Sequence, residues 1–378
     1  MSAPSPIAAG LVQEGQRMAS ICNACRYCEG YCAVFPALER RLSFSEGDLA
    51  YLSNLCHDCG ACYYACQYAP PHEFQLNLPK MMSEIRAATY RKYAWPGFLV
   101  ALFERNGLVV SVITMACIVL FLLGMIVFVD AQALLAVHAD SNGAFYALLS
   151  HGAMVRIFGA VFALALAMLL VAAARFWRDI GEQAGTILSA GPLGRSIDAA
   201  LRLTYLRGGG DGCAYSDDQP SPARRTYHQI TFYGFLFCFA ATCVATVYHY
   251  ALGRHAPYAW WSLPTLLGTA GGVALLIGPA GLLALKARRD AVLTNEKQVG
   301  MDVGFLAQLL IVSGTGLLLL ALRGSAAMGI LLALHLGAVM AFFITLPYGK
   351  FVHAVYRFTA LVRYYVERRR PVPELGPE

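Results

Sequence analysis

The chain is poor in charge, and this absence already excludes several classes of protein. Asp, Glu, Lys and Arg make up only 14% of its 378 residues, against 58% hydrophobic residues and a mean hydropathy of +0.53. This composition excludes an ordinary soluble domain and indicates a membrane protein with a smaller polar part. Residues 1–20 have no apolar core, so we expect no cleaved signal peptide. The net charge of +6 is modest and the basic residues lie beside apolar stretches, so no nucleic-acid binding is expected.

Two kinds of site are also missing. No G-x-G-x-x-G follows a predicted strand and opens a helix, so the chain is not expected to bind FAD itself. The interiors of the long apolar stretches contain no Asp or Glu, whereas an ion pump should place paired acidic residues there. A flavoenzyme and a pump are therefore both disfavoured.

Six stretches are long and apolar enough to cross a bilayer, which takes about 20 residues. They run over 107–129, 152–174, 229–252, 263–285, 303–322 and 325–348. The segments on one side carry seventeen Lys and Arg residues, whereas those on the other side carry only Arg254 and Arg323. Because positive residues are retained in the cytoplasm, we expect a multi-pass protein of the bacterial inner membrane with both termini cytoplasmic.

These stretches divide the chain. We expect a cysteine-containing domain over 1–90, an interfacial linker over 91–106, a membrane domain over 107–353 and a basic cytoplasmic tail over 354–378. The long cytoplasmic loop 175–228 is rich in Gly and Pro, which favours a flexible linker. A surface that packs against the cysteine domain or a partner is the alternative.

Eight of the twelve cysteines form two copies of the pattern C-x2-C-x2-C-x3-C, which is the spacing that binds [4Fe–4S] clusters. The first run is Cys22, Cys25, Cys28 and Cys32, and the second is Cys56, Cys59, Cys62 and Cys66. In two-cluster ferredoxins the fourth cysteine of each run ligates the other cluster. We therefore expect one cluster on Cys22, Cys25, Cys28 and Cys66, and the other on Cys56, Cys59, Cys62 and Cys32.

Other uses of these cysteines are less consistent with the pattern. Disulfides are rare in a reducing cytoplasm, and structural zinc takes its ligands as two separated pairs. The 34-residue offset between the runs is filled by the helix-like segment 37–55. The expected fold is thus all-α, a helical two-cluster ferredoxin domain followed by a six-helix transmembrane bundle.

Five of the nine histidines lie in or at the apolar stretches, and they are His151, His228, His249, His335 and His353. His335 and His353 are 18 residues apart, which is five turns of a continuous helix, so they would share one face. His228 and His353 fall on the cytoplasmic side, and His249 and His335 fall towards the outer side. Two histidines from facing helices can ligate a haem iron axially. We expect a haem b at His228 and His353 and leave open a second haem at His249 and His335.

The chain resembles the tricarballylate-utilization protein B family, also called the citrate-utilization B family, over essentially its whole length. The resemblance is carried by the two cysteine runs, the six apolar stretches and the motifs Tyr227-His228-Gln229 and Tyr348-Gly349-Lys350-Phe351-Val352-His353. The segment from His335 to His353 also resembles the haem-binding last helix of respiratory nitrate reductase gamma subunits, where two histidines at this spacing hold two haems.

The resemblance implies a membrane electron-transfer protein, a component of an oxidoreductase system that could include a quinone reductase step, and we assign no catalytic residue. It would take electrons from a cytoplasmic flavoprotein that oxidises tricarballylate, and pass them through two [4Fe–4S] clusters and one or two haems b to quinone. An electron-transfer subunit of a heterodisulfide-reductase-like or nitrate-reductase-like complex is one alternative. A membrane transporter or tether with an iron–sulfur sensor domain is another.

Overall fold

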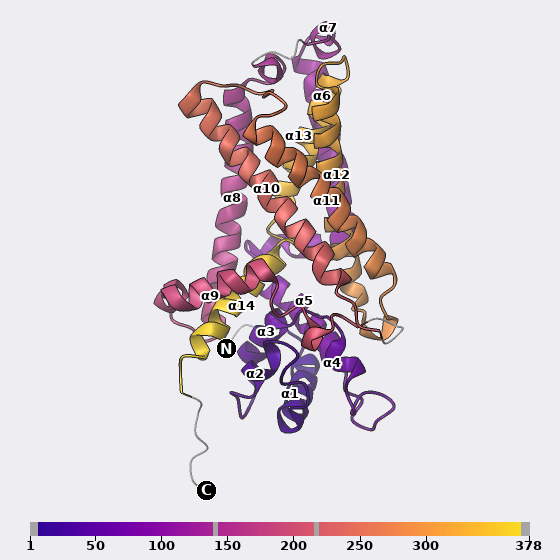
Figure 1. Cartoon of the computed structure of the whole chain (residues 1–378), viewed down its shortest axis with the longest axis vertical. Helices are drawn as coiled ribbons and strands as arrows, with labels where there is room; N and C mark the ends of the chain where they lie inside the picture. The colour runs from indigo at the N-terminus through magenta and orange to yellow at the C-terminus, as the bar shows by residue number, and fades with distance from the viewer. Residues whose placement is uncertain (1–6, 139–142, 215–218, 372–378) are drawn as a thin grey trace.

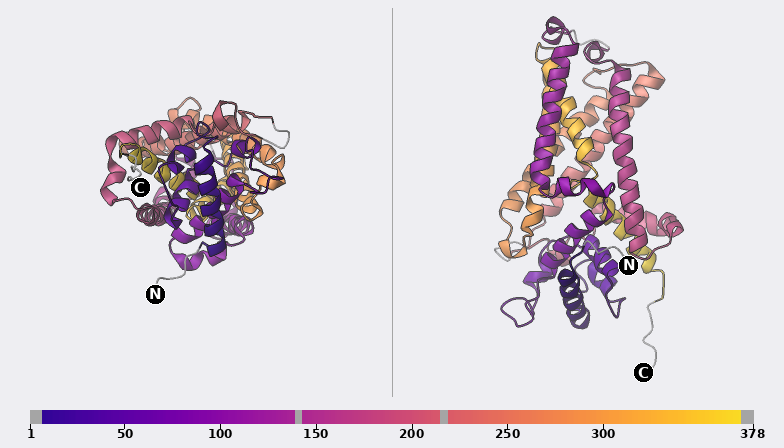
Figure 2. Two further views of the ribbon diagram at one scale, coloured as in Figure 1. Left: turned by 90° about the horizontal axis from the view of Figure 1, so that it is seen from below. Right: turned by 180° about the vertical axis from the view of Figure 1, so that it is seen from behind.

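The computed structural model describes residues 7–138, 143–214 and 219–371, and these residues form helices and turns without a named strand. Within that part of the chain, Cys213 and Ser221 make an isolated β-bridge. A tier of long helices stands above a tier of short ones in Figure 1, and the view from behind in Figure 2 shows the same two tiers. The expected all-α fold is confirmed.

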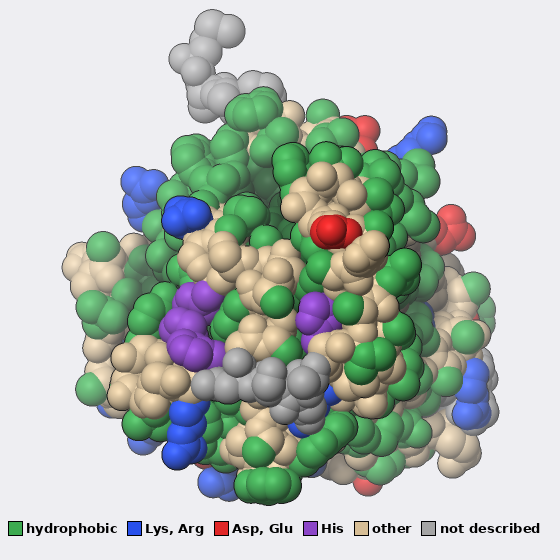
Figure 3. All heavy atoms as spheres, turned by 90° about the horizontal axis from the view of Figure 1, so that it is seen from above, with side chains coloured by type: hydrophobic (Ala, Val, Ile, Leu, Met, Phe, Trp, Pro, Cys, Tyr) green, Lys and Arg blue, Asp and Glu red, His purple; other side chains and the backbone are tan. Residues whose placement is uncertain are grey.

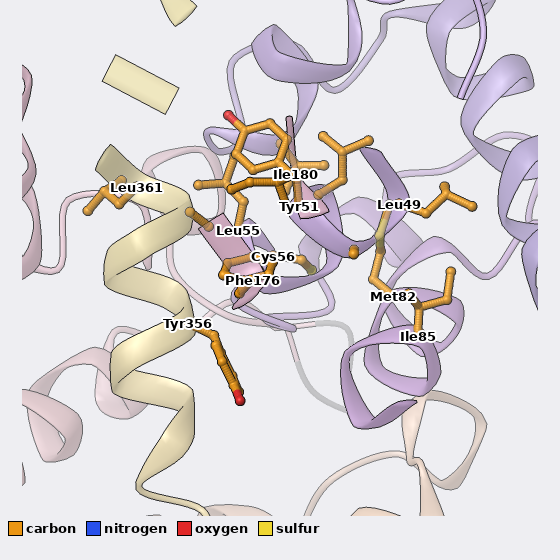
Figure 4. Packing of buried hydrophobic residues seen from close by; sticks show 14 of the residues in the cluster. Leu49, Tyr51, Leu55, Cys56, Met82, Ile85, Phe176, Ile180, Tyr356 and Leu361 are labelled. Carbon is orange, nitrogen blue, oxygen red and sulfur yellow. The ribbon is translucent and has the colours of Figure 1, made fainter. Parts of the chain in front are cut away.

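The lower tier holds the N-terminal domain. Its helices are α1 (Ala9–Cys25), α2 (Val34–Leu38), α3 (Glu46–Leu55), α4 (Ala61–Tyr64) and α5 (Leu78–Tyr93). A capping box starts α3, because the Ser45 hydroxyl accepts from the Asp48 N–H and the Asp48 carboxylate accepts from the Ser45 N–H. Buried side chains such as Leu49 and Met82 form the core between α3 and α5 (Figure 4). Cys56 is the C-cap of α3, so the second cysteine run starts at the edge of this core.

The upper tier holds six helices that are long and apolar enough to cross a membrane, which confirms the six expected spans. They are α6 (Asn106–Phe128), α8 (His151–Asp179), α10 (Ala223–Leu252), α11 (Leu263–Ala287), α12 (Glu296–Leu322) and α13 (Met328–Thr345). Short α7 (Ala131–Leu134) lies at the far end of the bundle (Figure 1). Large apolar side chains such as Leu120, Phe128 and Leu170 are exposed on the outside. Such a surface suits lipid hydrocarbon, because soluble proteins rarely expose large apolar patches.

The segment from His335 to His353 is not one continuous helix. The break lies at Pro347 and Gly349, after which α14 (Val352–Glu367) begins. Proline has no N–H to donate and its ring clashes with the preceding turn, and the Gly349 N–H closes a turn onto the last residue of α13 at 2.7 Å. His335 and His353 therefore lie on different helices, and the expectation that they share one helical face is wrong. Figure 1 shows α14 crossing the base of the bundle.

Helix α14 joins the two tiers, although a basic tail was expected from residue 354 onwards. Tyr356 of α14 (Figure 4) is buried, and its ring stacks on that of Tyr90 of α5 with ring centres 5.6 Å apart. Near the end of α14, the Glu367 carboxylate accepts a hydrogen bond from buried Arg41 of the N-terminal domain. Breaking a buried ion pair of this kind costs about 3–5 kcal/mol, so this contact anchors α14 to the domain.

The segment 175–228 is also more ordered than a flexible linker. Helix α8 continues to Asp179, and α9 (Ala190–Arg202) lies beside α14 at the base of the bundle (Figure 1). The Gly209 N–H donates to the Tyr31 carbonyl of the N-terminal domain at 3.3 Å. Gly212 has a φ of +115°, and a Cβ there would lie 2.3 Å from the carbonyl oxygen of residue 221, so only glycine fits. For residues 208–214 the structure thus agrees with the alternative, packing against the cysteine domain.

Candidate functional site

The eight cysteines of the two runs lie in two adjoining groups in the N-terminal domain. Burial, and then the neighbouring Cys66, raises the pKa of both Cys22 and Cys28 to about 12. Burial, and then the neighbouring Cys56, raises the pKa of Cys32. The fourth cysteine of each run therefore lies beside the other run, which is the arrangement that crossed ligation requires. We call Cys22, Cys25, Cys28 and Cys66 the first group, and Cys56, Cys59, Cys62 and Cys32 the second group.

All four cysteines of the first group line the same pocket. Phe35 and Leu76 form apolar parts of its wall, and Cys62 of the second group reaches the same pocket, so the two groups adjoin. Across the described ranges, no three His, Cys, Asp or Glu side chains converge as the ligands of one metal ion would. The ligands of a [4Fe–4S] cluster need not converge in that way, since they are distributed around several irons. The raised pKa values of Cys22, Cys28 and Cys32 mean that these three thiols are protonated at neutral pH unless a metal binds them. The two groups therefore fit cluster ligands.

Four arginines contact residues 55–58, where α3 ends and the second group begins, and they come from α5, α10, α14 and the segment after α11. They are Arg86, Arg224, Arg357 and Arg289, which we call the arginine cluster. Arg86 and Arg357 donate to the Cys56 carbonyl, at 2.8 Å from Arg86. Arg224 donates to the His57 carbonyl at 3.1 Å, and Arg289 donates to the Asp58 carboxylate at 2.8 Å. Positive charge near a cluster favours its reduced form, so this surrounding raises the reduction potential of a cluster held there.

Two further residues beside the second group had no signal in the sequence. Burial, and then the charge of Arg357, lowers the pKa of His57 well below its usual value, so its imidazole is neutral at neutral pH. Cys213 has only 2% of its surface exposed, and a hydrogen bond with Cys59 lowers its pKa to about 7. Because Cys213 lies outside both runs, only the folding of residues 208–214 onto the domain reveals this contact.

His228 of α10 and His353 of α14 face each other at the base of the bundle. Their ring centres are 6.2 Å apart and their planes meet at 84°. Imidazole nitrogens bind metals at about 2.0–2.1 Å, so two rings on opposite sides of one metal have centres about 6 Å apart. The Lys350 carbonyl lies 2.6 Å from Nδ1 of His353 and can only accept, which leaves Nε2 of His353 free for a metal. Nδ1 of His228 is buried without a hydrogen-bond partner. The pair therefore fits the two axial ligands of a haem iron.

The histidine pair lies next to the second cysteine group. Arg224 and His228 are four residues apart on α10, and Arg357 and His353 are four residues apart on α14, so each arginine lies one turn from its histidine on the same face. The same two arginines donate to carbonyls of residues 55–58. One pair of helices thus positions both the start of the second group and the two imidazoles.

His249 and His335 are not brought together as a facing pair. The ring of His249 stacks on that of His151 with centres 3.5 Å apart, and its Nδ1 lies 2.9 Å from Nδ1 of His255. His335 instead has its Nδ1 3.2 Å from Oγ1 of Thr315, because this face of α13 packs against α12. Histidine side chains are visible at the end of the bundle opposite the cysteines (Figure 3). The site left open for a second haem therefore has a different structure from the inner pair.

Comparisons with known proteins cover both tiers of the chain. A family model described as citrate utilization protein B matches residues 105–374, and one described as the citrate utilization protein B Fer4-like domain matches residues 15–92. A curated relative, "Citrate utilization protein B" of Escherichia coli, is 48% identical over 362 residues, which cover 94% of this chain and 93% of the relative. No solved structure matches the chain.

Proposed function

The chain belongs to the citrate utilization protein B family, and on this basis we propose that it is a membrane electron-transfer protein that accepts electrons from a cytoplasmic flavoprotein dehydrogenase and delivers them to quinone. Its family, its Fer4-like domain and its six apolar helices fit a role in citrate or tricarballylate utilization at a membrane. The dehydrogenase would oxidise the organic acid, and this chain would serve as its membrane acceptor.

The observation that carries the proposal is that the three sets of ligand side chains, the two cysteine groups and the histidine pair, adjoin one another in space. The first cysteine group lines a pocket beside Tyr27, a side chain that is 67% exposed. The second group adjoins the first, and the histidine pair lies one helical turn beyond the arginines that hold residues 55–58. The order leads from the surface of the N-terminal domain to the base of the membrane bundle.

Each set of side chains has a defined task in this proposal. The two cysteine groups would each hold a [4Fe–4S] cluster, and His228 and His353 would hold one haem b. When bound, these groups supply one-electron carriers. Cys28 and Cys56 are buried in the domain core and the other six cysteines of the two groups are half-buried, while the two imidazoles face each other between α10 and α14. The arginine cluster provides the positive charge next to the second group.

The proposed electron donor and the proposed orientation of the chain in the membrane are both inferred from the sequence. Without a dinucleotide-binding fingerprint in the chain, the flavin would be on a separate protein, which would dock on the N-terminal domain. The basic segments lie at the end of the bundle that carries this domain, so both would be in the cytoplasm, with the six helices in the inner membrane.

The alternative functions fit the arrangement less well. A transporter or tether with an iron–sulfur sensor would not need two imidazoles at metal-ligand separation next to the second group. A subunit of a larger respiratory complex would use the same cysteines and histidines to bind its clusters and haem. That alternative differs from our proposal only in the soluble protein that donates the electrons.

The proposal is tested with the purified protein, by its iron and haem content and by rapid mixing with a reduced flavoprotein dehydrogenase. We expect cluster absorbance to bleach on mixing and a low-spin haem to follow. His353→Ala should remove the low-spin signal while the clusters are still reduced, and His255→Ala, at the opposite end of the bundle, should leave the signal unchanged. Protein with full iron–sulfur content and no haem absorbance would rule out the haem, and direct reduction by NADH but by no flavoprotein would rule out the donor.

A further inference from the structure

A second pocket lies where α13 breaks before α14. It is a narrow, closely packed crevice formed by side chains from α6, α12, α13 and the break, so a ligand would have to part its walls. Phe305, Phe342 and Phe351 supply aromatic walls, and Gln308, Thr345 and Lys350 supply polar groups. A site with apolar aromatic walls and a few placed polar groups is typical of small-molecule binding.

The polar groups inside this pocket are unusual for a membrane helix. Gln308 lies within the span of α12 and is only 2% exposed. Its Nε2 donates to Oγ1 of Thr114 at 3.2 Å, and its Oε1 accepts from Oγ1 of Thr345 at 3.1 Å. An amide NH2 has two hydrogens, so one donor of Gln308 remains available. Polar side chains inside a membrane are costly and mark functional sites.

The pocket lies next to the histidine pair. Lys350 lines the pocket, and its carbonyl accepts from Nδ1 of His353. Phe351 also lines the pocket, and its ring lies 5.6 Å from that of Phe235, two turns from His228 on α10. A molecule in the pocket would therefore lie beside the side chains that we assign to the haem.

Lys350 links this pocket to charged side chains at the base of the bundle. Nζ of Lys350 is 2.6 Å from Oδ1 of Asp302, and Nζ of Lys286 is 2.6 Å from Oδ2 of the same carboxylate. Asp302 belongs to α12, which begins seven residues before the fifth stretch predicted from hydropathy, so sequence analysis placed this carboxylate outside the span. These side chains connect the pocket with the aqueous side that carries the N-terminal domain.

We propose that this pocket binds the ring of the quinone and is the site of its reduction, an inference that rests on the proposed function. A quinone ring is flat and apolar on both faces, which suits the three phenylalanines, and its two carbonyl oxygens accept hydrogen bonds, which Nε2 of Gln308 and Nζ of Lys350 can donate. In the reaction the quinone gains two electrons, which originate from the reduced flavoprotein, and two protons from water on the side of Lys286 and Asp302. Both carbonyls become hydroxyls, and the quinol returns to the lipid.

The first test locates the quinone without measuring turnover. The complete protein in phospholipid nanodiscs is illuminated with a short-chain azidoquinone, and the labelled peptides are identified by mass spectrometry. We expect label on residues 305–308 or 342–351, and an excess of unlabelled short-chain quinone should abolish it. Label confined to the histidine-bearing outer end of the bundle would overturn the proposal. So would label on 305–351 that excess quinone does not displace, because it would indicate a lipid chain in the pocket.

The second test uses a matched pair of substitutions on α12. Gln308→Leu should raise the KM for the quinone at least tenfold, lower the labelling in proportion and leave the rate of cluster reduction by the flavoprotein unchanged. Gln298→Leu changes a buried glutamine outside the pocket, which bonds Ser83, and should leave the KM at the wild-type value. An unchanged KM in Gln308→Leu refutes this inference alone. Clusters that no flavoprotein can reduce would refute the proposed function instead, whatever the labelling shows.

Discussion

Replacing Arg357 with glutamine should lower the reduction potential of the second cysteine group's cluster. Arg357 donates to the carbonyls of Leu55 and Cys56, and Cys56 is one of the expected ligands. Burial, and then the charge of Arg86, lowers the pKa of Arg357 to about 10, so its guanidinium is still charged at neutral pH. A unit charge about 7 Å from the cluster, at an effective dielectric constant of about 20, contributes about 2.4 kcal/mol. For one electron this is about 100 mV.

The measurement is a potentiometric titration followed by low-temperature EPR, which separates the two clusters. We expect the potential of the second cluster to fall by about 100 mV in Arg357→Gln, because the lost positive charge stabilised the reduced form. The first cluster should keep its potential. Arg368→Gln is the matched control, since Arg368 lies just beyond α14, where it is exposed and contacts the ring of Tyr364. An unchanged second potential, or equal shifts in both clusters, would refute the electrostatic reasoning.

Three other changes test the ligand groups, the topology and the anchoring of α14. Cys66→Ser should remove the EPR signal of the first group's cluster and spare that of the second, and the converse would contradict crossed ligation. Alkaline phosphatase should be inactive when fused at the C-terminus and active when fused after Gly253, because the basic segments lie at the base of the bundle, and the reverse pattern would invert the topology. Burial raises the pKa of Asp48, but hydrogen bonds from Ser45 and Arg41 outweigh it and lower the pKa below its usual value, so its charged form stabilises the folded state. That stability is present above the unfolded pKa of about 3.9 and is lost as the pH falls through the lower folded value. Asp48 also lies 3.4 Å from Arg363 of α14, so amide exchange should show α14 detaching from α3 only below about pH 4 in the wild type. Asp48→Asn should show faster exchange already at pH 7, by about 1–3 kcal/mol, and equal exchange at pH 7 would show that Asp48 does not anchor α14.

Features that depend on neighbouring residues in the chain were predictable. Each cysteine run spans only eleven residues, such as 22–32, so its spacing alone predicts cluster binding. The six spans follow from the length of the apolar stretches, since a bilayer requires about 20 apolar residues whatever the neighbouring helices are. Their orientation is predicted from the distribution of Lys and Arg for the same reason.

The break after α13 shows where this local reasoning ends. Pro347 and Gly349 are visible in the sequence, but proline is tolerated within membrane helices when neighbours satisfy the free backbone groups. Whether the helix continues or turns is decided by packing, here by Tyr356 and Glu367 against the N-terminal domain. The spacing of His335 and His353 therefore lost its meaning once α14 left the bundle.

What the sequence by itself determined are the cysteine runs, the spans and the end of the bundle that is rich in positive charge. Only the tertiary structure decided that His228 faces His353, that His249 pairs with His151, and that four arginines from separate elements surround the second cysteine group. It also decided that Gln308 lies in a pocket next to the histidine pair. The physical reason is that these contacts join residues far apart in the chain, so they depend on how helices pack and where one of them breaks, which no local pattern of residues specifies.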